Sequence, residues 1–154
     1  MDMQPELGGE LGRAGAGGLP RPRRTVDDAA HTPVVQLMSR EVVTVREDQR
    51  VEEAQRLMLD KELSRVPVVN EEGTLAGMLS RTDLLRHQPI KKGARVSQVM
   101  MRSTLRLRES ATVAQAAELM ALQHVHGIPV VSPEGRVVGM VSALDVMGWV
   151  AGLI

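Results

Sequence analysis

The amino-acid sequence predicts an α/β protein, of the mixed kind also described as α+β, built from two β-α-β-β-α units in tandem. Residues 34–83 align with residues 96–145 without a gap, and 19 of the 50 aligned pairs are identical. In each copy, a segment with helical apolar spacing precedes two short apolar runs separated by a turn that contains glycine. A constant offset across glycines, prolines and apolar positions indicates an internal duplication, so we expect the units to pack with pseudo-twofold symmetry.

The composition is that of a folded domain with few aromatic residues. The chain has 154 residues, of which 43% are hydrophobic and 25% charged, with one Trp and no Phe or Tyr. Its core is therefore expected to consist of Val, Leu, Ile, Ala and Met. Without aromatic platforms or net charge, nothing in the composition favours stacking on nucleic-acid bases or attraction to a polyanion. We therefore expect no nucleic-acid partner.

The absence of cysteine excludes disulfides, thiolate metal sites and a cysteine nucleophile. The N-terminal segment lacks the basic and then apolar layout of a signal peptide. No apolar run approaches the roughly 20 residues that a membrane-spanning helix needs. These features predict a soluble, cytoplasmic protein with no membrane partner.

Residues 1–33 differ in composition from the rest of the chain. They hold six of the 14 glycines and four of the eight prolines, and few large apolar residues. Such a segment buries too little surface to offset its ordering entropy, so we expect a disordered N-terminal tail. The basic cluster Arg21-Pro22-Arg23-Arg24 can in principle contact nucleic acid, but Asp27 and Asp28 follow it closely, which favours a solvated tail.

The first unit, residues 34–90, is expected to begin with a helical turn and a strand rich in β-branched residues. Asp48 is the expected N-cap of its first long helix, whose apolar residues recur at helical spacing. Gly73 is expected to adopt positive φ in the turn between the next two strands. The predicted elements are a turn at 34–38, strands at 42–45, 65–69 and 75–79, and helices over 49–62 and 80–87.

The second unit, residues 91–154, repeats this order. We expect strands at 104–107, 127–131 and 137–141, a helix over 112–123 and a helix from Ser142. The helices of each unit should cover one face of a small sheet. Because a unit of about 60 residues buries little surface alone, the two units should pack together. The apolar residues 149–154 are expected to cover the sheet or to meet another subunit.

The motifs Val66-Pro67-Val68-Val69 and Gly77-Met78-Leu79-Ser80-x-x-Asp83, and their counterparts 62 residues later, resemble those of the CBS-domain pair, or Bateman module. The resemblance covers about residues 34–149. It implies a sensor that binds an adenosyl ligand, such as AMP, ADP, ATP or S-adenosylmethionine, in clefts between two CBS repeats. It also implies a homodimer and an unidentified partner protein that the module regulates. We expect a stand-alone regulatory module, and neither an enzyme nor a protein with a required cofactor, because the chain offers no nucleophile–base pair or phosphate loop.

The pairs Ser80 with Asp83 and Ser142 with Asp145 are the first candidates for ligand contact. Each pair stands where a predicted strand ends and a helix begins. A carboxylate there can accept hydrogen bonds from ribose hydroxyls, and a hydroxyl with free helix N–H groups can bind phosphate. The same spacing also forms a capping box, which satisfies the helix terminus without any ligand. Both interpretations stay open at this point.

The resemblance assigns further positions to the base and the phosphate. Met78 and Met140 would lie against adenine, although ordinary core packing explains them equally well, and Val43 and Leu105 would hold the base from the first strand of each copy. Ser64, Arg65 and His126 precede the proline-containing strands, where related proteins often carry a basic pair that binds phosphate. Each copy keeps half of that pair, which favours AMP or S-adenosylmethionine over ATP.

Two other hypotheses remain. His124 and His126 alternate along the chain, but no cysteine or suitably spaced carboxylate accompanies them, so we predict no metal site. The second hypothesis is a ligand-free scaffold for protein interaction and dimerisation, in which the Ser–Asp pairs act only as helix caps.

Overall fold

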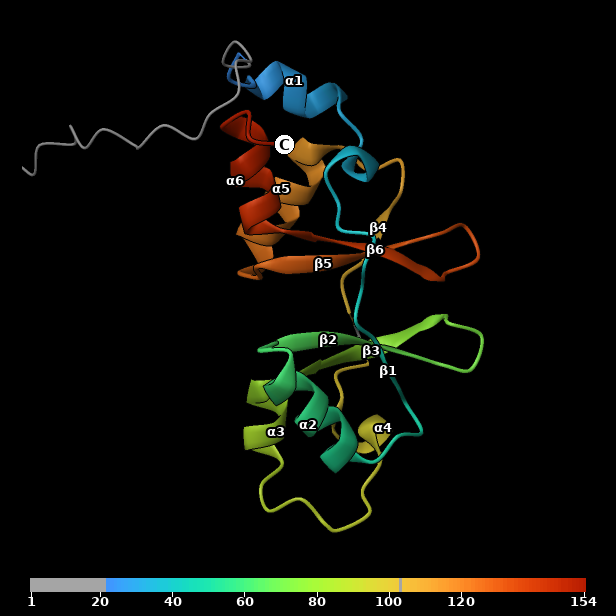
Figure 1. The fold of residues 1–154 in the computed structure, drawn as a ribbon. Coiled ribbons are helices and arrows are strands. Elements are labelled where there is room, and N and C mark those ends of the chain that lie inside the picture. The colour runs from blue at the N-terminus through green and yellow to red at the C-terminus, as the bar shows by residue number, and fades with distance from the viewer. Residues whose placement is uncertain (1–21, 103) are drawn as a thin grey trace, which may run out of the picture.

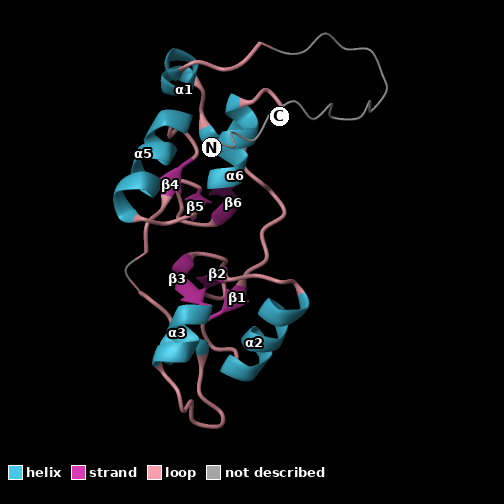
Figure 2. Ribbon diagram, turned by 90° about the vertical axis from the view of Figure 1, so that its left-hand side faces the viewer, coloured by secondary structure: helices cyan, strands magenta, loops and turns pink. Residues whose placement is uncertain are grey.

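Two layered halves stack with their sheets facing each other in the computed structural model, which describes residues 22–102 and 104–154 (Figure 1). Each half contains a three-stranded sheet, with helices on the side that faces away from the other half (Figure 2). The predicted mixed α/β architecture with two similar units is therefore confirmed.

The two halves contain the same elements in the same order. In the first, β1 runs parallel to β2, which is antiparallel to β3; β4, β5 and β6 repeat this arrangement in the second. The elements of the first half are β1 (Val45–Arg46), α2 (Val51–Asp60), β2 (Arg65–Val69), β3 (Leu75–Ser80) and α3 (Arg81–Arg86). Those of the second are β4 (Leu107–Arg108), α5 (Val113–Gln123), β5 (Gly127–Val131), β6 (Val137–Ser142) and α6 (Ala143–Val150).

The register of the hairpins is the same in both halves. Pro67 lies opposite Met78 in the first hairpin, and Pro129 lies opposite Met140 in the second. Gly73 turns the first hairpin with a φ of 80°, as predicted, and its counterpart in the second hairpin has a φ of 84°. A side chain is strained at such angles, which explains why glycine occupies both turns.

Each half completes the core of the other. The 3₁₀ turn η1 (Val34–Gln36) belongs to the first repeat in sequence, but Val34 packs in the core of the second half. The short helix α4 (Val96–Val99) of the second repeat packs in the core of the first half through Val96. Both valines have no exposed surface. Backbone hydrogen bonds hold this exchange, including Val34 N to Ala111 O at 2.7 Å.

Matched hydrogen bonds also join the tips of the two hairpins. The N–H of Leu75 donates to the carbonyl of Gly135 at 3.0 Å, and the N–H of Val137 donates to the carbonyl of Gly73 at 3.2 Å. The donors are 62 residues apart in sequence, and so are the acceptors. These reciprocal bonds are those expected of pseudo-twofold symmetry.

The first strand of each unit is shorter and later than predicted, and one predicted cap is wrong. β1 pairs over two residues, and residues 41–44 lie outside the sheet because they belong to the segment that crosses from the second half to the first. Residues 104–106 likewise precede β4. Helix α2 begins after Arg50 without a side-chain cap, and Asp48 instead forms an ion pair with Arg46.

The expected disordered tail is corrected where the structure describes it. Helix α1 (Val26–His31) packs against α5, and its N-terminus carries a complete capping box between Thr25 and Asp28. The guanidinium of Arg24 lies 5.2 Å from the ring centre of Trp149, and the backbone N–H of Arg24 donates to the carbonyl of Val150 at 3.2 Å. The low apolar content of this segment does not reveal these local bonds. Residues 1–21 of the predicted tail lie outside the described residues.

The C-terminal segment divides between core and surface. Trp149 is 3% exposed and packs in the core of the second half, whereas Leu153 and Ile154 are exposed. No helix in the described part of the chain is both long and apolar enough to cross a membrane.

Candidate functional site

A pocket of about 330 Å³ lies between the two halves, at the end where β2 and β5 begin. Residues of both repeats line it. Three predicted site residues, Arg65, Met78 and Leu105, meet there. The other lining residues are Met101, Thr104, Gln123, Val125, Gly127 and Pro129.

The segment that crosses from the first half to the second brings the two repeats together at this pocket. Met78 and Met101 form an isolated antiparallel bridge, in which each N–H donates to the other's carbonyl at 2.9 and 2.8 Å. Gly77 permits this approach, because a Cβ at that position would collide with the carbonyl oxygen of Met101. The crossing segment then places Thr104 and Leu105 on the pocket wall.

The pocket combines an apolar surface with one cation. Met78, Leu105, Val125 and Pro129 supply apolar contact area suited to a flat ring. Arg65 is partly buried, and its Nε is shielded from solvent without any hydrogen-bond partner among the described residues. A buried donor without a partner costs free energy unless a ligand or water satisfies it. The pocket is thus suited to an apolar ring attached to an anionic group.

Both predicted Ser–Asp pairs form capping boxes. In the first, the N–H and Oγ of Ser80 donate to Asp83 Oδ2 at 2.9 and 2.8 Å, and Asp83 N–H donates back to Ser80 Oγ at 3.1 Å. In the second, Ser142 N–H donates to Asp145 Oδ2 at 2.8 Å, and Asp145 N–H donates to Ser142 Oγ at 3.1 Å. Neither pair lines the 330 Å³ pocket. The capping role is therefore observed, and a contact with ligand stays a prediction.

The carboxylates keep a free acceptor beside this capping role. The capping bonds of both aspartates use Oδ2, and across residues 22–102 and 104–154 no donor bonds to either Oδ1. Asp83 is 7% exposed, whereas Asp145 is only partly buried. Each cap can therefore coexist with one hydrogen bond from a ligand hydroxyl.

The remaining predicted site residues lie apart from the pocket. Met140 is on β6 and Val43 on the crossing segment before β1; both are partly buried and do not line it. Ser64 is exposed, and its carbonyl accepts a bond from Arg81 N–H at 3.0 Å. His126 lines a groove between α5 and α6 instead. The structure therefore does not bring Arg65 and His126 together.

Four lining residues were not among the predicted site residues: Met101, Thr104, Gln123 and Val125. Thr104 adjoins Leu105, so the motif comparison could have found it. Gln123 and Val125 reach the pocket because His124 between them adopts a left-handed conformation, with a φ of 53°. Histidine adopts positive φ more often than most residues, but the sequence does not single out His124 for that conformation. No group of three or more metal-ligating side chains occurs within the described ranges.

Comparison with known proteins agrees with this geometry. The CBS domain family matches residues 34–89 and 96–152. Homoserine O-acetyltransferase of Methanohalobium evestigatum is 27% identical over 117 residues, which cover 76% of this chain and 24% of that enzyme. The chain therefore spans about a quarter of the length of this relative.

Solved structures of CBS domain pairs have the same fold. The CBS domain pair of protein MJ0100 in complex with 5′-methylthioadenosine and S-adenosyl-L-methionine is 26% identical, with a TM-score of 0.67 and coverage of 75% of this chain and 97% of that one. CBSX2 in complex with AMP is 27% identical, with a TM-score of 0.69 and coverage of 75% and 93%. The cytosolic domain of the Mg²⁺ channel MgtE in complex with ATP is 34% identical, with a TM-score of 0.68 and coverage of 76% and 48%.

The two family matches coincide with the two repeats found in the sequence, and they include the exchanged segments and both capping boxes. This chain belongs to the CBS domain family, with two CBS domains in tandem.

Proposed function

We propose that the pocket between the repeats binds an adenosyl ligand and that the chain acts as a regulatory module. The observation that carries this proposal is the unpartnered Nε of Arg65 beside the apolar wall that Met78 and Leu105 form. The similarity to CBS domain pairs crystallised with S-adenosylmethionine, AMP or ATP supports the same class of ligand.

AMP or S-adenosylmethionine is the proposed ligand, in preference to ATP. In this proposal adenine lies against Met78 and Leu105, and Arg65 binds the phosphate or carboxylate group. Among the residues that the structure describes, Arg65 is the only cationic side chain that lines the 330 Å³ pocket. A single guanidinium neutralises a monophosphate better than a triphosphate. Asp83 Oδ1 is the proposed acceptor for a ribose hydroxyl, and Asp145, Met140 and Val43 take the matching roles in a second cleft.

The proposed regulation follows from where the ligand would bind. Arg65 and Met78 belong to the first repeat, and Leu105 and Pro129 to the second. A ligand that contacts both repeats stabilises the arrangement in which those contacts coexist, and so shifts the population of conformations. We propose that an associated protein responds to that shift. The related acetyltransferase is a larger protein in which the matching segment is one part, which is consistent with a regulatory role for the module.

A second copy of the chain is the proposed partner at the outer helices. Large apolar side chains are exposed on α2 and α3 of the first half and on α5 and α6 of the second, where they would otherwise face water. They are Leu59 at 66%, Leu85 at 73%, Leu122 at 66%, Leu144 at 75% and Met147 at 58% exposure. Because both halves present such a surface, a homodimer related by twofold symmetry would cover both.

The ligand proposal can be tested by thermal unfolding with AMP, ATP, S-adenosylmethionine and GTP. A ligand that binds only the folded state raises Tm as its concentration increases. We expect AMP or S-adenosylmethionine to do so and GTP not to. Arg65→Gln should weaken the binding of AMP by roughly tenfold or more, because a charge-assisted hydrogen bond is lost. Arg81→Gln is the matched control, since Arg81 lies at the same end of the sheet but outside the pocket.

Asp83→Ala separates the ligand proposal from the scaffold alternative. The substitution removes a helix cap, so it should cost about 1 kcal/mol in the free energy of unfolding under either hypothesis. Loss of the AMP-dependent rise in Tm, beyond that cost, would support ligand contact. If no adenosyl compound raises the Tm of the wild type, the Ser–Asp pairs are caps alone and the scaffold hypothesis replaces the sensor.

A further inference from the structure

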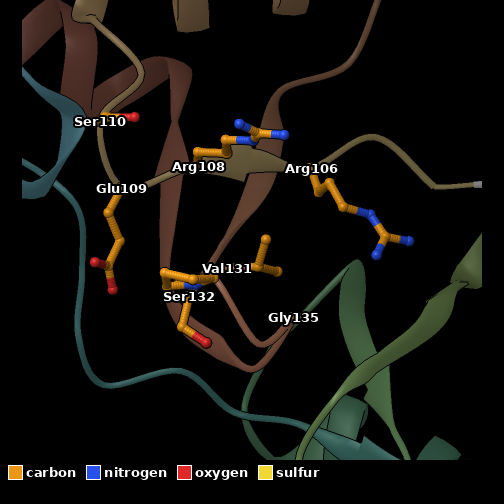
Figure 3. A pocket seen from close by; sticks show the side chains of 8 residues that line it. Arg106, Arg108, Glu109, Ser110, Val131, Ser132 and Gly135 are labelled. Atoms are coloured by element: carbon orange, nitrogen blue, oxygen red, sulfur yellow. The ribbon is translucent and has the colours of Figure 1, made fainter.

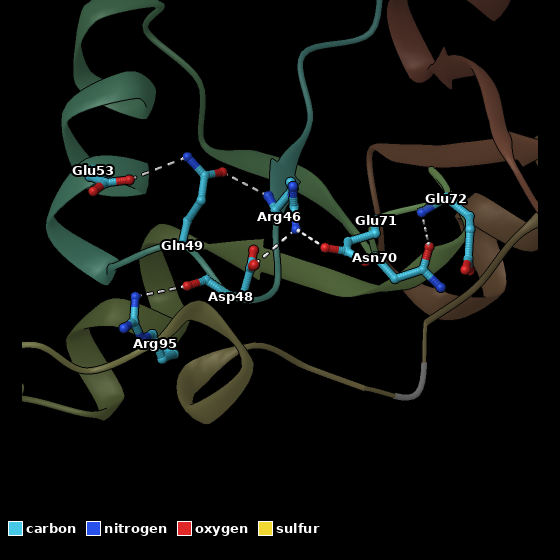
Figure 4. Close-up of polar contacts among 8 residues, drawn as sticks. All are labelled: Arg46, Asp48, Gln49, Glu53, Asn70, Glu71, Glu72 and Arg95. Carbon is cyan, nitrogen blue, oxygen red and sulfur yellow. Dashed lines mark hydrogen bonds and ion pairs between the residues drawn. The ribbon is translucent and has the colours of Figure 1, made fainter.

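The two repeats differ in charge at the tip of the first hairpin and its counterpart. In the first repeat, Arg46 Nη2 bonds to Asp48 Oδ2 at 2.9 Å and to Glu71 Oε1 at 3.3 Å (Figure 4). Two carboxylates thus neutralise this arginine. Both are more than half exposed, so the pairs contribute little to stability, but they do occupy the guanidinium.

In the second repeat, the same position holds Arg108, but neither acidic partner is present. The 62-residue offset places Ser110 where the first repeat has Asp48, and Pro133 where it has Glu71. A second arginine, Arg106, replaces Thr44. The set in the first repeat, with Arg46 against Glu47, Asp48 and Glu71, carries a charge of −2. The set in the second repeat, with Arg106 and Arg108 against Glu109, carries +1.

A pocket of about 750 Å³ lies at this unneutralised pair (Figure 3). In the described part of the chain, neither Arg106 nor Arg108 takes part in a salt bridge or a side-chain hydrogen bond. Figure 3 shows Arg106 extending toward the hairpin of the first half, with the Glu109 carboxylate on the opposite side of the pocket. Two guanidinium groups without partners therefore border one cavity.

Hydroxyl groups add neutral donors to the pocket. Ser132 Oγ accepts a hydrogen bond from Arg136 N–H at 3.2 Å, so its own hydrogen is available to donate. Its counterpart in the first repeat is Asn70, whose Oδ1 accepts the bonds from Glu72 and Thr74 that shape the turn. Ser110 is exposed at the rim.

We propose that this pocket binds a small phosphate-bearing molecule at a site distinct from the adenosyl pocket. Guanidinium groups bind phosphate oxygens with paired, charge-assisted hydrogen bonds, and serine hydroxyls complete such a shell. The volume lies in the range of small-molecule sites. The pocket shares no lining residue with the 330 Å³ pocket, and it borders the end of β5 where the other pocket borders its beginning.

The test is calorimetric titration of the whole chain with pyrophosphate at low ionic strength. We expect Arg106→Ala and Arg108→Ala each to weaken binding by about fivefold, and the double variant by more than tenfold. Arg46→Ala is the matched control, because it removes an arginine from the same position in the first repeat and should leave the affinity unchanged. Raising NaCl from about 50 to about 200 mM should weaken binding, since exposed charges are screened.

A charge-restoring variant tests the same inference without removing any arginine. Ser110→Asp combined with Pro133→Glu introduces the acidic pair of the first repeat. This double variant should bind pyrophosphate more than tenfold more weakly than the wild type. Absence of pyrophosphate binding to the wild type, or equal losses in Arg46→Ala and Arg108→Ala, would overturn the proposal. Loss of pyrophosphate binding in Arg65→Gln but not in Arg108→Ala would also overturn the proposal, and would place the pyrophosphate in the adenosyl pocket.

Discussion

Met101 lies across Met78, and the two backbones exchange hydrogen bonds of 2.8 and 2.9 Å, with the carbonyl oxygen of Met101 directly over Gly77. The equivalent contact in the other half joins Ser39 to Met140 beside Gly139, with both bonds at 2.9 Å. Each crossing segment thus binds to the sheet of one half as it leaves for the other. The glycines at these positions are required by the close approach of a second backbone.

Gly77→Ala should therefore destabilise the fold. The new methyl would collide with a backbone carbonyl, and the crossing segment would have to move. We expect a loss of roughly 1–3 kcal/mol in the free energy of unfolding, measured with urea. Gly127→Ala is the control, because the nearest atoms to its Cβ lie at 3.5 and 3.6 Å, an ordinary contact distance. Equal losses in the two variants would contradict this account.

Val34→Ala should loosen the second half more than the first, although Val34 belongs to the first repeat in sequence. Its side chain is fully buried in the core that contains Ile128. Removing its methyl groups should cost roughly 2 kcal/mol. In this variant the amide hydrogen exchange of β5 should accelerate more than that of β2. In Val96→Ala the exchange of β2 should accelerate more. Faster exchange at β2 in the Val34 variant would be incompatible with the exchanged cores.

Docking of α1 should weaken in acid. The backbone N–H of Thr25, and then its hydroxyl, hydrogen-bond to the Asp28 carboxylate and lower its pKa below the ordinary value of 3.8. The folded form therefore binds this proton less readily than the unfolded form. The stabilisation is present above pH of about 4 and is lost as pH falls through the lowered pKa.

The only tryptophan of the chain, Trp149, provides the measurement, because Arg24 lies over its ring just before the capping box. Trp fluorescence should change in the wild type as the pH falls below about 4 and through the lowered pKa of Asp28. In Asp28→Asn the acid-dependent step should disappear. A step that persists unchanged in this variant would assign the transition to another carboxylate.

Replacing apolar residues on the outer helices should separate a dimer into monomers. Leu85→Glu and Met147→Glu each place a charge on one of the two exposed helical surfaces, at equivalent positions of the two repeats. A buried charge without a partner would disfavour association by several kcal/mol. Sedimentation of the wild type at several concentrations should give the mass of a dimer, and the double variant that of a monomer. Arg86→Glu, on the same helix as Leu85, controls for the added negative charge.

Local patterns predicted most of the fold correctly. The two hairpins and the turn glycines Gly73 and Gly135 depend on residues near one another in sequence, and the duplication depends on a constant offset between local patterns; the structure confirms all of them. The exchange of Val34 and Val96 could not be predicted in this way. The local sequence of an apolar turn is the same whether it packs in the core of its own half or in that of the other. The first strands are predicted too early for the same reason, since residues 42–44 have strand composition but belong to the segment that crosses between the halves.

The candidate site was predicted less completely than the fold. Arg65, Met78 and Leu105 were identified from motif positions, and they meet at one pocket. Gln123 and Val125 depend on the left-handed His124, which no local pattern indicated. The charge difference between Arg46 and Arg108 is visible in the aligned repeats, but its meaning required the ion pairs of the structure.

The exchanged segments also restrict how the molecule can respond to a ligand. Drawing the halves apart would remove Val34 from one hydrophobic core and Val96 from the other, and would expose both cores to water. Such an opening would cost free energy comparable to unfolding. The pocket therefore cannot open by a hinge motion that separates the two halves. Motion that keeps both valines buried is limited to small rotations of one half against the other. A ligand signal would therefore leave the module as a change in the angle between its two outer helical surfaces.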